Sequence, residues 1–250
     1  MEKIMRFREC KALLDSSPMP LETGIERLES GGIHVAVRMC LESLTAQMLD
    51  WWFGYECDTN LYQLWHPGAH KFSEWGEYEA NHVPGNVIGT THFIKEQMGP
   101  MGLAEMQLKY LDPEELFGED LKTAKERGDA DVVLYGWGGV VMNGTLMKNE
   151  KGYPSLMQYV GVGRNTPYGL VLRNHYWLGD EIDLPKSVIE SIATDELALY
   201  LMQHDSNEFH ILSKVIPPFY LKENWEALGK PEPYIKTAEL SKSMTAKSLV

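Results

Sequence analysis

The feature that most constrains the fold is a helical pattern near the C-terminal end of the chain. It begins near Thr194, with Asp195 and Glu196 in the favourable first turn, and we expect it to end before Pro217-Pro218. Residues three or four apart form one face of this helix: Leu197, Leu201, His204, Glu208, Ile211, Leu212 and Val215. This face is apolar apart from two ionisable residues, so it is the face that packs inward.

Stretches typical of β-strands precede this helix. The alternation after Gly31-Gly32 predicts a strand between Gly24 and about Met39, and Ser43 or Thr45 can then cap a helix running to about Phe53. Four further strands are predicted, the last two joined by a turn over 164–169: Met106–Tyr110, Asp131–Val141, Leu156–Val162 and Leu170–Trp177. Strands followed by one long helix predict an α+β fold, an antiparallel sheet wrapped around a helix with a cavity between them.

The 250 residues are divided into three parts. Residues 1–23 are expected to form a helical extension, with a short polar helix from about Lys3 to Leu14. Residues 24–220 form the main domain, and residues 221–250 form a tail that is polar and loosely ordered from Pro231.

Composition excludes several classes of function. A net charge of -13 without any cluster of Lys or Arg argues against binding to nucleic acid. No run of about 18 apolar residues is present, so no membrane span is predicted. Three widely spaced cysteines offer no disulfide framework, and the N-terminus does not resemble a signal peptide, which together indicate the cytoplasm.

His204 and Glu208 are the first candidates for chemistry. They lie one turn apart on the inward face of the last helix, and a buried, unpartnered carboxylate costs several kcal/mol, on the order of 2–7 for a polar group and more for a charge. Glu208 therefore needs a partner. A divalent metal and a buried hydrogen bond between His204 and Glu208 both satisfy the spacing, which leaves the choice open.

Two other segments offer ligands for a metal. The segment Leu64–His70 contains His66 and His70 in an aromatic, turn-forming context. If residues 87–96 form a strand, alternation places Glu96 on one face with Ile94, His92 and Thr90. Two histidines and two glutamates suit Zn²⁺, with Fe or Mn as alternatives.

Two sequence strings are more specific. Residues 50–54 read DWWFG and residues 64–70 read LWHPGAH, and in this order they closely resemble the 2,4-diacetylphloroglucinol hydrolase family, which also contains phloretin hydrolase. The resemblance extends over roughly residues 24–220. It implies a helix-grip fold similar to Bet v 1 proteins, a homodimer, and zinc-dependent hydrolysis of the carbon–carbon bond between an acyl group and a phloroglucinol-type ring.

The resemblance also implies roles for single residues. Tyr62 and Tyr176 match tyrosines that contact the phenolic substrate, and His66 is the alternative to His70 for the first ligand. The implied zinc ligands are His70, Glu96, His204 and Glu208.

The chain departs from the family pattern near the turn at 164–169. The family has a histidine where this chain has Gly161, and Asn165 replaces an acidic residue; His175 or His92 could compensate. A second interpretation is therefore a helix-grip protein that binds hydrophobic aromatic ligands without chemistry. A third is another zinc enzyme acting on polyketide-like rings.

Overall fold

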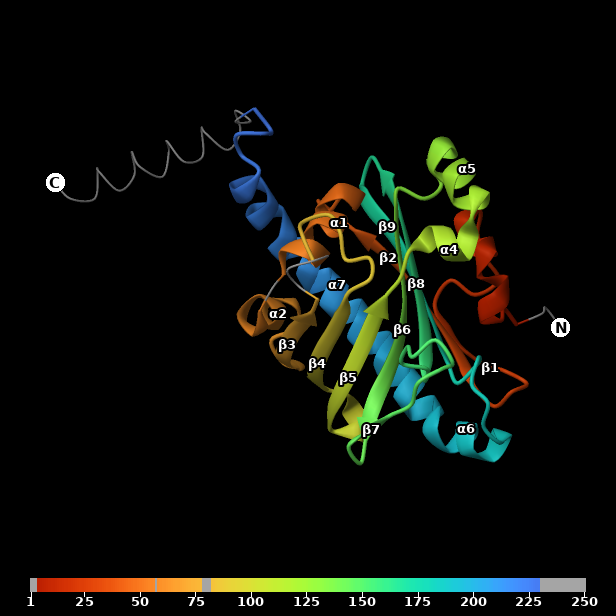
Figure 1. Cartoon of the computed structure of the whole chain (residues 1–250). Helices are drawn as coiled ribbons and strands as arrows, with labels where there is room; N and C mark the ends of the chain where they lie inside the picture. Colours follow the sequence, from red (N-terminus) through yellow and green to blue (C-terminus); the bar gives the residue numbers. More distant parts are fainter. Residues whose placement is uncertain (1–3, 57, 78–81, 230–250) are drawn as a thin grey trace.

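One antiparallel sheet forms most of the fold. A computed structural model describes residues 4–56, 58–77 and 82–229, and in these ranges the strand order is β1-β2-β9-β8-β6-β5-β4-β3, with β7 paired to β6 (Figure 1). The strands are β1 Gly24–Arg27, β2 Ile33–Leu41, β3 His70–Gly76, β4 Thr91–Gln97, β5 Leu103–Tyr110, β6 Val132–Met142, β7 Thr145–Leu146, β8 Met157–Thr166 and β9 Gly169–Leu178.

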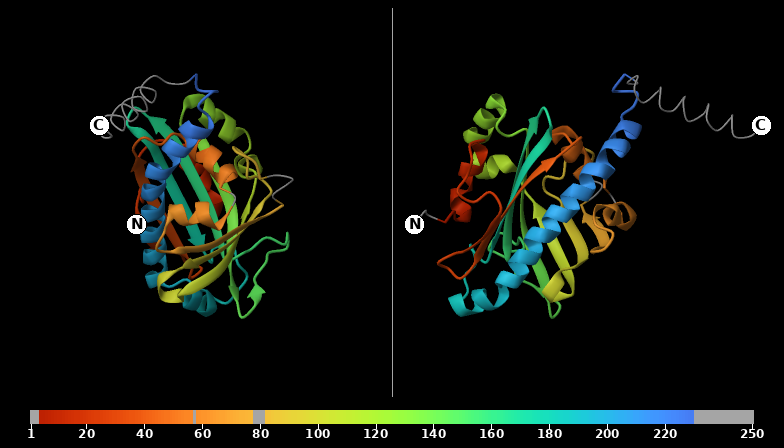
Figure 2. Two further views of the ribbon diagram at one scale, coloured as in Figure 1. Left: turned by 90° about the vertical axis from the view of Figure 1, so that its left-hand side faces the viewer. Right: turned by 180° about the vertical axis from the view of Figure 1, so that it is seen from behind.

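A long helix, α7 (Asp195–Glu223), runs diagonally across one face of this sheet (Figure 2). Its N-cap is Thr194, whose side chain accepts a hydrogen bond from the Leu197 amide. The sheet curves around the helix, which confirms the predicted α+β helix-grip architecture.

The predicted end of this helix is wrong, because Pro217 and Pro218 lie inside it. Each proline removes one backbone hydrogen bond, which favours termination in a helix considered alone. Packing opposes that tendency: Phe219 lies edge-on against Trp52, and Tyr220 lies edge-on against Trp51. Contacts between α7 and helix α1 (Ala46–Tyr55) thus accompany a helix that continues past both prolines.

The inner face of the sheet and the inward face of α7 enclose the main core. In β2 the odd-numbered residues point inward, and in β9 the even-numbered residues do so. Trp51, Trp52 and Trp65 all belong to this core, as their density in the sequence favoured.

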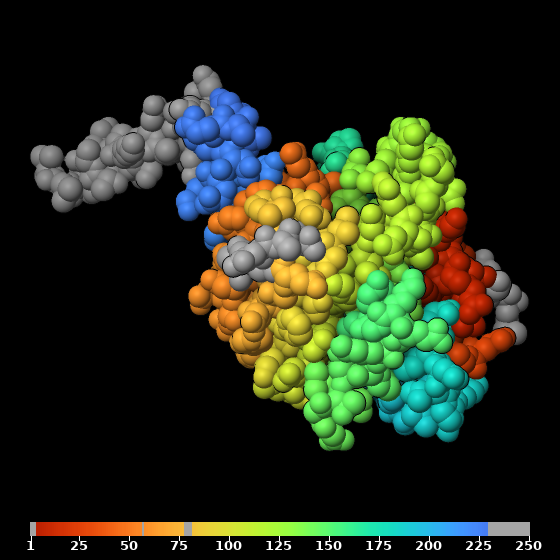
Figure 3. All heavy atoms as spheres, viewed as in Figure 1, coloured from red at the N-terminus to blue at the C-terminus, as the bar shows by residue number. Residues whose placement is uncertain are grey.

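The outer face of the central strands is covered by a second layer. It comprises the 3-10 helix η1 (Phe7–Leu14), α4 (Pro113–Phe117) and α5 (Glu119–Arg127). The first helix begins at Phe7, while Lys3 lies outside the described residues, and its buried side chains show that it is amphipathic rather than polar. Arg6 pairs with Asp180, and Figure 3 shows the red N-terminal segment beside the cyan segment around residue 180.

Three segments differ in detail from the sequence prediction. The region Gly24–Met39 is a hairpin of β1 and β2 rather than one strand, because residues 28–32 form its turn. Thr45, not Ser43, caps α1. The segment before His70 is helix α2 (Thr59–Trp65), capped by Asp58, and a short helix α6 (Lys186–Ile192) precedes α7.

Candidate metal centre and cavity

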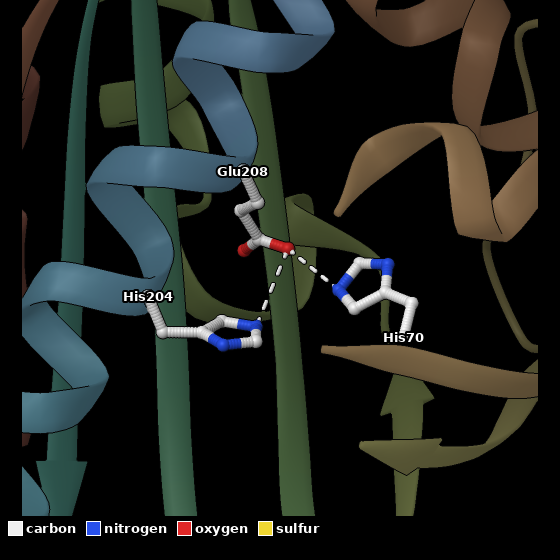
Figure 4. A group of neighbouring side chains, drawn as sticks. All are labelled: His70, His204 and Glu208. Carbon is white, nitrogen blue, oxygen red and sulfur yellow. Dashed lines mark ion pairs between the residues drawn. The ribbon is translucent and has the colours of Figure 1, made fainter. Parts of the chain in front are cut away.

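The four predicted ligands converge at one place between the sheet and α7. His70 begins β3 and lies opposite Glu96 of β4, while His204 and Glu208 lie on successive turns of α7. Figure 4 shows the Glu208 carboxylate between the two imidazoles, with Oε2 lying 3.3 Å from His70 Nε2 and 3.8 Å from His204 Nε2.

Glu96 closes the group from the sheet. Its Oε2 lies 3.3 Å from His204 Nε2, and its Oε1 lies 3.6 Å from His70 Nε2. The strand phase explains this position: Thr90, His92, Ile94 and Glu96 are all buried on the inner face, as the alternation predicted. Each carboxylate therefore lies near both imidazoles.

Burial determines the charges in this group. It raises the pKa of Glu208 to about 8 and also raises the pKa of Glu96. It lowers the pKa of His204 to about 3, with His70 and His66 adding to the effect, and lowers the pKa of His70. Without a cation, burial thus favours neutral carboxyls and neutral imidazoles over ion pairs.

These properties fit a divalent cation. Ligand atoms of His70, His204 and Glu208 all lie within 4.8 Å of one another. Among the described residues His70 Nε2 has no hydrogen-bond partner, whereas its Nδ1 lies 2.9 Å from the Tyr62 carbonyl oxygen. A backbone acceptor at Nδ1 fixes the tautomer in which Nε2 carries the lone pair, as is usual for metal-bound histidine.

His66, the alternative first ligand, lies beside this group. It is the C-cap residue of α2, and its ring stacks on that of His204 at 4.9 Å. No carboxylate contact of His66 is found in the described ranges, whereas His70 has two. The geometry favours His70 over His66.

A cavity extends from this group along the inner face of the sheet. It contains about 940 Å³ of space not filled by atoms, its open mouth included. Glu96, His204 and Glu208 line one part, with Tyr62 and His92 nearby. Most of the remaining wall is apolar, and it includes the methionines Met98, Met101, Met106 and Met157.

Both predicted substrate-contacting tyrosines line this cavity. The Tyr62 hydroxyl donates to Glu96 Oε1, and its ring stacks on His70 at 3.9 Å between ring centres. The Tyr176 hydroxyl donates to Asp205 Oδ1, which also accepts from Asn174 Nδ2 at 2.8 Å. In both cases the hydroxyl proton goes to a buried carboxyl, so the oxygen lone pairs remain to accept hydrogen bonds.

Asp205 was not predicted from the sequence. It is fully buried, and burial raises its pKa well above the usual range. It lies on the inward face of α7 that contains Glu208, which is three residues further along the helix. The signal was its i, i+4 spacing from Leu201 and Phe209, which places it on an inward face of α7.

Tyr159 occupies the space beside Gly161. A Cβ at position 161 would lie 2.5 Å from the Tyr159 hydroxyl oxygen and 2.7 Å from Asn174 Oδ1. Tyr159 also donates to Asn174 Oδ1 at 3.1 Å and lines the cavity.

Two histidines were considered as replacements for the histidine that the family has at position 161. His175 lies beside Trp177 and His34 on the outer face of the sheet, whereas His92 lines the cavity.

A curated relative is similar to most of this chain. The chain is 25% identical over 199 residues to phloretin hydrolase of Eubacterium ramulus, covering 73% of this chain and 65% of that protein. The chain thus spans just under two thirds of the length of this curated relative.

Similarities to solved structures are weaker. Ara h 8.0201 matches with 11% identity and a TM-score of 0.42, over 77% of this chain and 98% of that one. Protein Ms6760 from Mycobacterium smegmatis matches with 11% identity and a TM-score of 0.40, over 78% and 96%. The helix-grip description rests instead on the strand order and on α7.

The helices of the described ranges include none with the length and apolar character needed to cross a membrane.

The decisive comparison is at the level of the family. The sequence pattern of the DAPG hydrolase PhiG domain matches residues 4–221, which include all four candidate ligands and both tyrosines. The chain belongs to the DAPG hydrolase PhiG domain family.

Proposed function

We propose that this protein is a zinc-dependent hydrolase that cleaves the carbon–carbon bond between an acyl group and a phloroglucinol-type ring. The observation that supports it most is the convergence of His70, Glu96, His204 and Glu208 at a largely apolar cavity. Membership of the DAPG hydrolase family and the similarity to phloretin hydrolase support the substrate class, a phenolic ketone.

The four side chains would hold the cation, and when bound it would supply Lewis acidity and lower the pKa of water. Glu96 is oriented by the Tyr62 hydroxyl and His70 by the Tyr62 carbonyl, so one residue positions two ligands.

The cavity walls would orient the ring. The oxygens of Tyr62 and Tyr176 would accept hydrogen bonds from ring hydroxyls, since their own protons are donated to carboxyls. The reaction adds the OH of water to the ketone carbon and leaves the bonding electron pair on the ring. The ring hydroxyls stabilise this electron pair, because they allow the ring to exist as a keto tautomer. The apolar cavity wall excludes bulk water from the ring.

Two other functions compete with this proposal. A helix-grip binding protein for hydrophobic aromatic ligands would use the cavity without chemistry. Another zinc enzyme acting on polyketide-like rings would use the cation on a different bond. The paired carboxylates favour catalysis over binding, because a carrier of apolar ligands has no need of a cation. Cytoplasmic location remains a prediction from the sequence, and the homodimer remains an implication of the family resemblance.

The first test is the metal content of the purified protein, measured by mass spectrometry for the wild type and for His204→Ala. We expect about one zinc per chain in the wild type and loss in the variant. A well-folded wild type without stoichiometric metal would favour a buried His–Glu hydrogen bond and the binding function.

The second test separates turnover from binding. Chromatography follows the release of the carboxylic acid and the deacylated ring from acylphloroglucinols, and calorimetry follows ligand binding. Glu208→Gln should abolish turnover while ligand affinity stays close to that of the wild type. If both stay unchanged, the metal assignment is wrong.

A further inference from the structure

A second polar group is buried beside the cavity, next to the Tyr62 ring. Ser73 Oγ lies 2.8 Å from His92 Nε2 and donates to Glu56 Oε1 at 3.0 Å. Trp75 Nε1 donates to the other carboxylate oxygen of Glu56 at 2.8 Å. Glu56, Ser73 and His92 therefore form a hydrogen-bonded series with His92 at the cavity end.

The bonding pattern assigns the protons. Glu56 accepts from both Ser73 and Trp75, as an ionised carboxylate does. Ser73 has one hydroxyl proton, which goes to Glu56, so its oxygen accepts from His92 Nε2–H. A neutral imidazole that donates from Nε2 carries a lone pair on Nδ1. No hydrogen bond to Nδ1 of His92 is found among the described residues, so this lone pair is available.

The position of His92 relates it to the candidate metal centre. The Tyr62 ring contacts both, stacked on His70 at 3.9 Å and edge-on to His92 at 5.1 Å. His92 also lines the same cavity as Glu96, His204 and Glu208. A phenolic ketone with its acyl group at the metal centre would therefore have its ring in a cavity whose wall includes His92.

Packing holds the imidazole in one orientation. Trp75 stacks on it with 3.9 Å between ring centres and an angle of 7° between the planes. Burial lowers the pKa of His92 well below its usual value, and His70 and His82 add to this effect. His92 is thus neutral at neutral pH. Burial raises the pKa of Glu56 to about 7, so its ionised form, which can stabilise a proton on His92, is populated from about neutral pH upward.

We propose that His92 is a catalytic residue of this site, the base that accepts the proton of the substrate ring hydroxyl distal to the acyl group, with Ser73 and Glu56 as its positioning residues. This inference rests on the proposed function and names the group that acts on the ring.

The step balances with water as the co-reactant. The ring O–H proton passes to His92 Nδ1, and the oxygen electron pair moves into the ring. The ring carbon that bears the acyl group then takes a proton from water, and the remaining hydroxide forms a bond to the ketone carbon. The carbon–carbon bond breaks, its electron pair returns to the ring oxygen as phenolate, and that oxygen recovers the proton from Nδ1. The products are the deacylated phenol and a carboxylic acid.

The test compares two imidazoles, those of His92 and His82, that both stack on the Trp75 indole. His82 also stacks on this indole, at 4.1 Å, but its Nε2 bonds to the Phe53 carbonyl and it is not part of the cavity wall. His92→Gln should lower kcat by about 10²–10⁴-fold, the usual contribution of a general base, with zinc content unchanged. His82→Gln is the matched control and should stay within a few-fold of the wild type.

Ser73→Ala keeps His92 and tests the relay without truncating a stacked ring. Loss of the partner that orients a metal-bound histidine costs about 10–100-fold, and we expect a similar loss here, in kcat rather than in KM. The backbone amide of Ser73 donates to Thr59 Oγ1, and this contact between β3 and α2 does not involve the Ser73 side chain. The contact is therefore retained in the Ser73→Ala variant.

A spectroscopic measurement decides the matter independently of turnover. The probe is 4-hydroxyacetophenone, which lacks ortho hydroxyls and whose absorption moves to longer wavelength when its hydroxyl donates a hydrogen bond to a basic nitrogen. Bound to the zinc-loaded wild type and to His82→Gln, it should show this shift, and bound to His92→Gln it should not. Identical spectra in all three proteins, or no binding to the wild type, overturn the proposal. If the wild type cleaves no acylphloroglucinol, the proposed function fails, while the probe spectrum still decides the role of His92.

Discussion

Replacement of Glu208 by Gln should change how stability depends on pH in the metal-free protein. Burial raises the pKa of Glu208 to about 8 from its ordinary value of 4.5, so the folded protein keeps a proton that the unfolded chain releases. Between these two pH values the wild type therefore loses stability as pH rises. Gln cannot titrate and removes this contribution.

The magnitude follows from the two pKa values. A difference between about 8 and 4.5 corresponds to on the order of a few kcal/mol across the window, since each tenfold change in proton affinity is worth about 1.4 kcal/mol. Glu56, with a pKa raised to about 7 by burial, acts in the same direction, while His204, with a pKa lowered to about 3, acts in the opposite one. Glu56 is present in both proteins, so its effect cancels in the difference between wild type and variant. The Glu208 charge also raises the pKa values of Glu96 and Asp205, and its removal in the variant makes the fall in that difference steeper.

The assay is urea denaturation of chelator-treated protein at several pH values from 4 to about 9, a range that brackets the expected titration. The free energy of unfolding of the wild type, minus that of Glu208→Gln, should fall across the window and level off above it. Added zinc should reverse the trend, because the bound cation requires the ionised carboxylate. A difference that stays constant with pH in the metal-free proteins would refute the reasoning.

Three further predictions concern packing. Gly161→Ala should destabilise the fold by about 1–3 kcal/mol, because the added Cβ would meet the Tyr159 hydroxyl at 2.5 Å; Tyr159→Phe in the same chain should recover part of the loss, and a strictly additive double variant would contradict this. Phe7→Ala should cost roughly 3–5 kcal/mol in denaturation experiments, since the ring is buried on the outer face of the sheet, and a cost below 1 kcal/mol would show that the extension is not docked there in solution. Tyr176→Phe should cost about 1–2 kcal/mol by removing a buried donor to Asp205, and KM for an acylphloroglucinol should rise as well; an unchanged KM would exclude a hydrogen bond from substrate to this hydroxyl.

The sequence was informative wherever one periodicity determined the position of a side chain. Alternation in β4 placed Glu96 and His92 on the inner face, and the i, i+4 spacing placed His204 and Glu208 together on α7. It could not show that β3 and β4 approach this particular turn of the helix, because pairing between distant segments depends on the whole fold.

Two errors have the same physical origin. The helix was predicted to end before Pro217 because local preference was the only information available there, yet aromatic contacts with α1 accompany its continuation. The series from Glu56 to His92 was missed because its members come from the end of α1, from β3 and from β4. Neither feature leaves a periodic trace in the sequence.

The placement of the candidate ligands has a consequence for folding order. His70 and Glu96 belong to a hairpin at one edge of the sheet, whereas His204 and Glu208 belong to the helix that crosses its centre. A cation held by all four would act as a removable cross-link between segments separated by β5 to α6, closing a long loop of chain. The attachment of the edge hairpin to α7 would then depend most on the supply of metal. The chain would be able to assemble β2, β9, β8 and α7 before the metal binds.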